Sequence, residues 1–153
     1  MTEAPFRYYL RVRYHECDAQ LVVFNARYGD YVDIASMEFF RAIGLADEVA
    51  SGAFDVQLVK QTTTWTAPAR NNDVLEITVS ARAVGTSSFA VAAQFRIAGT
   101  PAVICEIETV YVRVDNKTLT KKPLSDDHRA ALARGAPGVE IDHAGYKIAH
   151  SRT

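Results

Sequence analysis

DAQLVVFNARYGDYVDIASMEFFRAIG, residues 18–44, is the stretch from which we predict both the fold and the active site. It begins with an isolated carboxylate, Asp18, passes through a short apolar turn and continues into a segment rich in large side chains. Apolar residues recur in this segment at spacings of three and four, which is typical of an amphipathic helix. Further large residues lie outside that stripe, so we expect the helix to be buried on more than one side.

The predicted helix has recognisable end signals. Asn25 is a candidate N-cap, because its short side chain can accept a hydrogen bond from a free amide one turn later. Asp30 and Asp33 follow in the first turns, where negative charge interacts favourably with the helix dipole. Gly44 comes directly after Ile43 and predicts the left-handed residue that often ends a helix.

The chain has 153 residues, which predicts one domain spanning 1–153 with a proper core. We expect this core at about 6–115 and a C-terminal helix and tail at 123–153. The net charge of −1 argues against nucleic acid as a partner. No apolar run approaches the roughly 18 residues of a membrane span, and we see no signal peptide. We therefore expect a cytoplasmic protein that does not insert into membranes, with two reduced cysteines rather than a disulfide framework.

Outside the long helix, the dominant pattern is that of β-strands. Alternating apolar residues or β-branched runs predict strands at 6–14, 54–67, 74–84, 89–97 and 103–115. The last three are long and joined by short turns, so an antiparallel meander is the simplest arrangement. One long helix and a five-stranded antiparallel sheet make an α+β fold.

The remaining segments give weaker signals. Residues 45–52 predict one or two helical turns. Residues 121–135 predict a surface helix that begins after Ser125 as N-cap and ends at Gly135. Residues 137–153 show no periodicity, and we expect this tail to be loosely held.

The run RYHECDAQLVVFNARYGDYVDIASMEFFRAIG, residues 13–44, resembles the hot-dog-fold acyl-CoA thioesterases of the 4-hydroxybenzoyl-CoA thioesterase type. In that family an aromatic residue precedes an acidic-X-Asp triplet, a Gly-containing turn, two apolar residues, and a Tyr, His or Asn before the helix. The likeness covers about 6–115. Leu21 stands where many members carry Gly. The residues that match are Tyr14, Glu16, Asp18, Val22, Val23, Asn25 and Tyr28.

The resemblance implies a hot-dog fold, in which the sheet wraps the long central helix, and the hydrolysis of an acyl-CoA thioester. Asp18 would act as nucleophile or general base. Backbone amides near Asn25 and Ala26 would polarise the carbonyl, since free N–H groups at a helix start face negative charge. Asn25 could cap the helix, bind the carbonyl or a water, or do both. CoA is part of the substrate, and no cofactor is implied.

Further substrate contacts follow from the same resemblance. Residues around the helix start would line the acyl site, and the stretch Val59 to Thr63 would line it from a partner subunit. The turn between the third and fourth predicted strands would lie near CoA. The alternatives stay open: Tyr28 fits a core aromatic, and the hydroxyls near 86–88 fit an ordinary hairpin turn. The candidate substrate-binding residues are Val23, Phe24, Ala26, Tyr28, Val59, Gln61, Thr63, Arg82, Ser87 and Ser88.

We expect a homo-oligomer, because one sheet on one helix leaves edge strands unprotected. Val59, Trp65, Phe89 and Phe95 cannot all face a single helix, so a second subunit should cover some of them. A dimer is the minimum, and the resemblance favours a dimer of dimers, a homotetramer.

Several rival interpretations remain. His15 and Cys17 could form a Cys–His pair, but a strand-end His and a small buried Cys explain them better. Glu38 is a weaker candidate for a second acid. The four histidines are too scattered for a metal site. Rival functions are an acyl-carrier-protein thioesterase, which a basic docking surface would favour, a non-catalytic acyl-binding module, and a hot-dog dehydratase.

Overall fold

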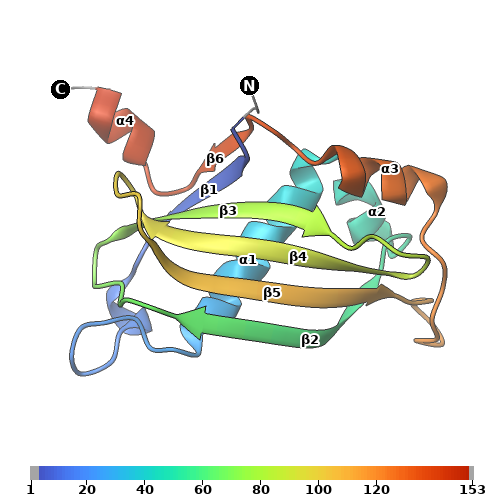
Figure 1. Ribbon diagram of the computed structural model, residues 1–153, viewed down its shortest axis with the longest axis horizontal. Coiled ribbons are helices and arrows are strands. Elements are labelled where there is room, and N and C mark those ends of the chain that lie inside the picture. The colour runs from blue at the N-terminus through green and yellow to red at the C-terminus, as the bar shows by residue number, and fades with distance from the viewer. Residues whose placement is uncertain (1–3, 152–153) are drawn as a thin grey trace.

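A six-stranded sheet curves around the long helix α1 (Figure 1). The computed structural model describes residues 4–151, so both ends of the predicted 1–153 domain lie outside the described residues. The strands are β1 (Phe6–Arg11), β2 (Val56–Trp65), β3 (Val74–Arg82), β4 (Ser88–Ile97), β5 (Val103–Arg113) and β6 (Glu140–Asp142). The helices are α1 (Arg27–Ala42), α2 (Ala46–Ser51), α3 (Asp126–Arg134) and α4 (Tyr146–Ser151), with a short 3-10 turn at Tyr14–Glu16.

The strands lie in the order β2-β5-β4-β3-β1-β6. Strands β3, β4 and β5 form the predicted antiparallel meander. β2 adds to β5 and β1 adds to β3, both antiparallel, so the five predicted strands belong to one sheet. The α+β prediction is therefore confirmed.

The prediction of only five strands and a loosely held tail was wrong. β6 pairs with β1 in parallel, with Glu140 opposite Arg7. The Arg7 guanidinium contacts the Glu140 carboxylate, and the Tyr8 hydroxyl lies 2.8 Å from Nδ1 of His143. These contacts join residues more than 130 positions apart, which no local pattern reveals.

Besides α1, two predicted helices are present: α2 lies within 45–52 and α3 within 121–135, whereas α4 was not predicted. At 16 residues, α1 is still the longest helix of the described chain. Ser125 caps α3 as predicted: its side chain accepts a hydrogen bond of 3.0 Å from the His128 amide.

Of the predictions for the two ends of α1, one was wrong and one is confirmed. Asn25 is not the N-cap; Ala26 occupies that position, and no side chain caps the helix there. The chain already turns before the helix, since the Arg27 amide donates to the Phe24 carbonyl at 2.9 Å. At the other end Gly44 has φ of 91° and its amide donates to the Arg41 carbonyl, so its predicted role in ending the helix is confirmed.

The core lies between α1 and the inner face of the sheet. Phe89 and Phe95 are 1% and 0% exposed in it, so both face the helix after all. Trp65 and Val59 on the edge strand β2 remain 48% and 58% exposed. Of these four large side chains, the exposed ones therefore lie on the edge strand β2.

Candidate active site

Glu16 anchors the loop that joins β1 to α1. Its carboxylate is 4% exposed and accepts hydrogen bonds from the Arg13 amide at 2.8 Å, from Arg13 Nη2 at 2.6 Å and from the Tyr31 hydroxyl at 2.9 Å. Burial alone would raise the pKa of Glu16, but the hydrogen bonds from Arg13 and Tyr31 outweigh it and lower the pKa below its usual value. The Phe24 amide donates to the Glu16 carbonyl at 3.0 Å, which ties the two ends of the loop together.

Asp18 and Leu21 open and close a tight turn within this loop. The Leu21 amide donates to the Asp18 carbonyl at 2.9 Å, and the Asp18 amide donates to the Val22 carbonyl at 2.9 Å. This is a hairpin turn with a bulge at Leu21, where φ is 60°. Asp18 is exposed, and its Oδ1 accepts from the Gln20 amide at 2.8 Å. Asp18 thus steadies the turn through one carboxylate oxygen and leaves the other open to a ligand.

The amides around the start of α1 divide into used and free groups. Those of Val23 and Phe24 donate to the carbonyls of Ala69 and Glu16. Within residues 4–151, no hydrogen bond occupies the amides of Asn25 and Ala26, and both residues are exposed. Two backbone donors at the entrance of α1 are therefore available to an oxygen atom that carries negative charge.

The inner side of β2 lies along the first turns of α1. Gln61 Oε1 is 4.0 Å from the position that a Cβ would take at Gly29, and Gln61 Nε2 donates to Thr109 Oγ1 at 3.0 Å. The Tyr28 ring is 2% exposed and packs edge-on against Trp65, with 6.3 Å between the ring centroids. Gln61 and Trp65 of β2 thus reach the first turn of α1 within one chain. A contribution of Val59 and Thr63 from a partner subunit stays a prediction.

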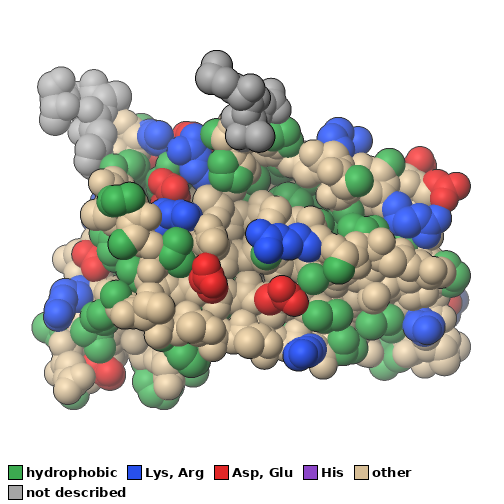
Figure 2. Space-filling view, viewed as in Figure 1, with side chains coloured by type: hydrophobic (Ala, Val, Ile, Leu, Met, Phe, Trp, Pro, Cys, Tyr) green, Lys and Arg blue, Asp and Glu red, His purple; other side chains and the backbone are tan. Residues whose placement is uncertain are grey.

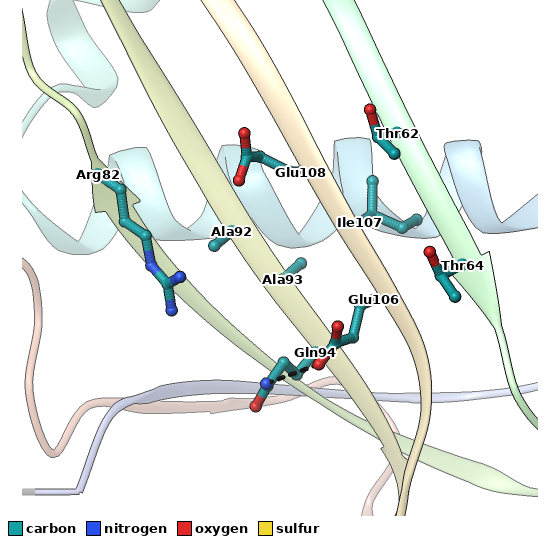
Figure 3. Close-up of a pocket in the computed structure, with 9 residues that line it drawn as sticks. All are labelled: Thr62, Thr64, Arg82, Ala92, Ala93, Gln94, Glu106, Ile107 and Glu108. Atoms are coloured by element: carbon teal, nitrogen blue, oxygen red, sulfur yellow. Dashed lines mark hydrogen bonds between the residues drawn. The ribbon is translucent and has the colours of Figure 1, made fainter.

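Arg82 lies away from this region. It lines a hollow of about 260 Å3 with Thr62, Thr64, Gln94 and Glu108, on the face of the sheet opposite α1 (Figure 3). The space-filling view shows basic and acidic side chains interspersed on this face (Figure 2). The largest predicted group, by contrast, gathers on the loop before α1 and on its first turns: Asp18, Val23, Phe24, Asn25, Ala26 and Tyr28.

Ser87 and Ser88 lie at the end of the sheet where α1 finishes, since β4 begins at Ser88 opposite Val112 of β5. They line a shallow hollow with Thr86, Lys121 and Pro123. Within one chain they are therefore separated from the Asp18 turn by the length of the sheet (Figure 1).

The geometry does not support a cysteine nucleophile or a metal site in the described part of the chain. The Cys17 sulfur lies 3.8 Å from the Arg13 carbonyl oxygen, and burial, then the neighbouring Asp18 and Glu16, raise the pKa of its thiol. The protonated thiol is a poor nucleophile. In the described part of the chain, no three His, Cys, Asp or Glu side chains are grouped as a metal site would need. No helix among residues 4–151 is long and apolar enough to span a bilayer.

Comparison with known proteins identifies a matching family and several similar solved structures. The Thioesterase-like superfamily matches residues 12–132. The solved structure of BH1999 gentisyl-coenzyme A thioesterase is 25% identical, with a TM-score of 0.73, covering 83% of this chain and 98% of its own. The 1,4-dihydroxy-2-naphthoyl-CoA thioesterase Slr0204 from Synechocystis is 19% identical, with a TM-score of 0.75 and coverage of 85% and 96%.

A third structure, SAV2348 from Staphylococcus aureus in complex with CoA, is 14% identical, with a TM-score of 0.79 and coverage of 88% and 85%. No functionally curated protein matches the sequence significantly. The family match spans the Asp18 turn, α1 and all strands except β1 and β6. The chain therefore belongs to the thioesterase-like superfamily, with a hot-dog fold and thioester hydrolysis as its class of activity.

Proposed function

We propose that the protein hydrolyses an acyl-CoA thioester to the free acid and CoA, with Asp18 and the α1 entrance as its active site. The observation that carries this proposal is the pairing of a half-free carboxylate on Asp18 with the two unused amides of Asn25 and Ala26 on one loop. A carboxylate and a pair of oxyanion donors are the two parts that acyl transfer requires. The thioesterases named above act on gentisyl-CoA and 1,4-dihydroxy-2-naphthoyl-CoA, which supports CoA as the carrier.

The free Asp18 oxygen has two possible roles in the reaction. As a nucleophile it attacks the thioester carbonyl carbon, the C–S bond breaks and the CoA thiolate leaves; water then hydrolyses the mixed anhydride. As a general base it takes a proton from a water molecule that attacks the same carbon. In both cases the Asn25 and Ala26 amides donate to the carbonyl oxygen as negative charge develops on it. Neither route needs a metal or a cofactor.

The edge strand β2 makes a homodimer the smallest working unit in this proposal. Its backbone pairs with β5 on one side and is open on the other, and Val59 and Trp65 are exposed along it. A second copy that pairs there in antiparallel orientation brings its own Asp18 turn towards the Ser88 end of the first sheet. Ser87 and Ser88 would then contact CoA from the second subunit, and two such dimers would form the tetramer. Arg82 faces away from α1, so we do not include it in this site.

Two aspartate variants test the catalytic role. Asp115 is the matched control for Asp18, because it begins a similar turn: its Oδ1 accepts from the amides of Lys117 and Thr118. Hydrolysis of a panel of aromatic and aliphatic acyl-CoAs is followed by loss of the thioester absorbance, since a thiol-trapping reagent would also meet Cys17. We expect Asp18→Asn to lower kcat at least ~10²-fold and Asp115→Asn to leave it within a factor of two.

The outcomes separate the alternatives. If Asp18→Asn retains full turnover, thioester hydrolysis stands and the active site is misplaced. If a folded wild-type oligomer hydrolyses no acyl-CoA, the CoA substrate is wrong, and acyl-carrier-protein substrates are tried next.

A further inference from the structure

The chain builds two related turns, closed by hydrogen bonds between residues three and four positions apart, and each ends in a leucine with positive φ. One turn starts at Asp18 and places Leu21 at φ 60°; the other starts at Asp115 and places Leu119 at φ 58°. In each, the leucine amide donates to the carbonyl of the starting aspartate, at 2.9 Å and 2.8 Å. In each, the aspartate carboxylate also accepts from amides inside the turn.

Glycine suits both positions better than leucine does. At positive φ a Cβ approaches the backbone carbonyl oxygen, so L-residues other than Asn and Asp avoid this region. The hydrogen bonds around Leu21 hold it there: the Asn71 amide donates to the Leu21 carbonyl at 3.1 Å. Strained backbone positions cluster at functional sites, which makes Leu21, in the turn of Asp18, the leucine to consider for a role in the active site.

The position of Leu21 suggests what that role is. The hydrogen bond between Leu21 and Asp18 is that of a β-turn, which keeps their Cα atoms within about 7 Å. The Leu21 side chain is 47% exposed, as are Phe24 at 51% and Trp65 at 48%, on segments that flank the entrance of α1. An isobutyl group is thus held in the same tight turn as Asp18 and is open to solvent.

We infer that the Leu21 side chain forms an apolar wall of the acyl-binding space and restricts the size of the acyl group. This inference rests on the proposed function of the Asp18 turn. Leu21 would therefore bias this enzyme towards small or flat acyl groups, since a pocket that lacks room for added carbon atoms rejects them by 10- to 200-fold, roughly.

Three variants separate the side chain from the strain. Leu21→Gly removes both, Leu21→Ala removes most of the side chain and keeps the strain, and Leu119→Gly removes strain at the opposite end of the sheet. Binding of two non-hydrolysable thioether analogues of CoA, one with an ethyl group and one with a bulky branched aromatic group, is measured by calorimetry. Thermal unfolding is measured for every variant.

We expect Leu21→Gly and Leu21→Ala to raise the affinity for the bulky analogue relative to the ethyl analogue at least ~10-fold. Leu119→Gly should leave this ratio unchanged. Both glycine variants should raise Tm by about 2–4 °C, and the alanine variant should not.

An unchanged or lowered affinity ratio in both Leu21 variants overturns the inference, whatever their Tm. Binding is measured without turnover. If wild type is inactive but the Leu21 variants still shift the affinity ratio, the proposed hydrolysis is refuted and the role of Leu21 in acyl binding is supported. If wild type and variants bind neither analogue, both proposals fall.

Discussion

Replacing Glu16 by Gln tests whether this buried carboxylate holds the catalytic loop. Gln keeps the shape of the side chain but loses its charge and replaces one acceptor oxygen by a donor. Glu16 Oε2 accepts from Arg13 Nε at 3.1 Å and from Nη2 at 2.6 Å, so a Gln nitrogen at that position would face two donors. The Oε1 position could still accept from Tyr31.

The expected loss follows from the surroundings of each partner. A hydrogen bond to a charged group contributes about 1.5–3 kcal/mol. The Arg13 side chain is 62% exposed, so its ion pair with Glu16 adds at most about 1 kcal/mol. We expect Glu16→Gln to lower the free energy of unfolding by about 2 kcal/mol, equivalent to a drop in Tm of roughly 4–8 °C.

The stability difference between wild type and Glu16→Gln should depend on pH in one direction. Because the folded state lowers the pKa of Glu16, its stabilisation is complete above the unfolded pKa of about 4.3 and is lost as the pH falls through the folded value. Urea unfolding at pH 7 and at pH values below about 4 should therefore show the difference between wild type and Glu16→Gln shrinking with acid.

Two control variants bracket this result. Tyr31→Phe removes one hydrogen bond and should cost about 1 kcal/mol. Asp30→Asn breaks the exposed ion pair with Arg27 and should cost less than about 0.5 kcal/mol. A Glu16→Gln protein as stable as wild type at pH 7, or a difference that does not change with acid, would refute the reasoning.

Two further predictions concern thiols and assembly. Burial raises the pKa of Cys105 to about 12, so a disulfide reagent should titrate one thiol per native chain, from Cys17, and two after denaturation; two fast thiols in the native state would contradict the buried position of Cys105. Val59→Lys on the open edge of β2 should shift the protein towards monomers in light scattering, whereas Thr100→Lys in the β4–β5 turn should not; an unchanged mass for Val59→Lys would place the interface elsewhere.

The sequence predicted the elements whose pattern is local. Leu75, Ile77 and Val79 of β3 alternate with less buried residues because one face of the strand meets α1. The Gly44 signal appears directly after the helix that it ends. These features depend on neighbours within a few residues, so periodicity and capping signals suffice to find them.

The misplaced features depend on distant partners. β6 has only three residues and pairs with β1 across the whole chain. Glu16 belongs to the recognised motif, yet its burial depends on Tyr31, fifteen residues later. Asn25 carries a common N-cap side chain, but hydrogen bonds that begin at Phe24 move the helix start past it. The positive φ of Leu21 runs against its residue type and could be suspected only because Gly is common there in the resembling family.

β6 also has a consequence for the dimer proposed above. A sheet with two open edges can add copies at both ends and grow into a fibre. Here β6 covers β1 along Arg7–Tyr9, so β2 is the longer edge left for another strand. Two copies that join through β2 about a two-fold axis use up that edge in both partners, and the shared sheet then ends at a β6 strand on each side. In the proposed dimer the short strand β6 would therefore act as a terminator, which would limit growth through the sheet to a pair.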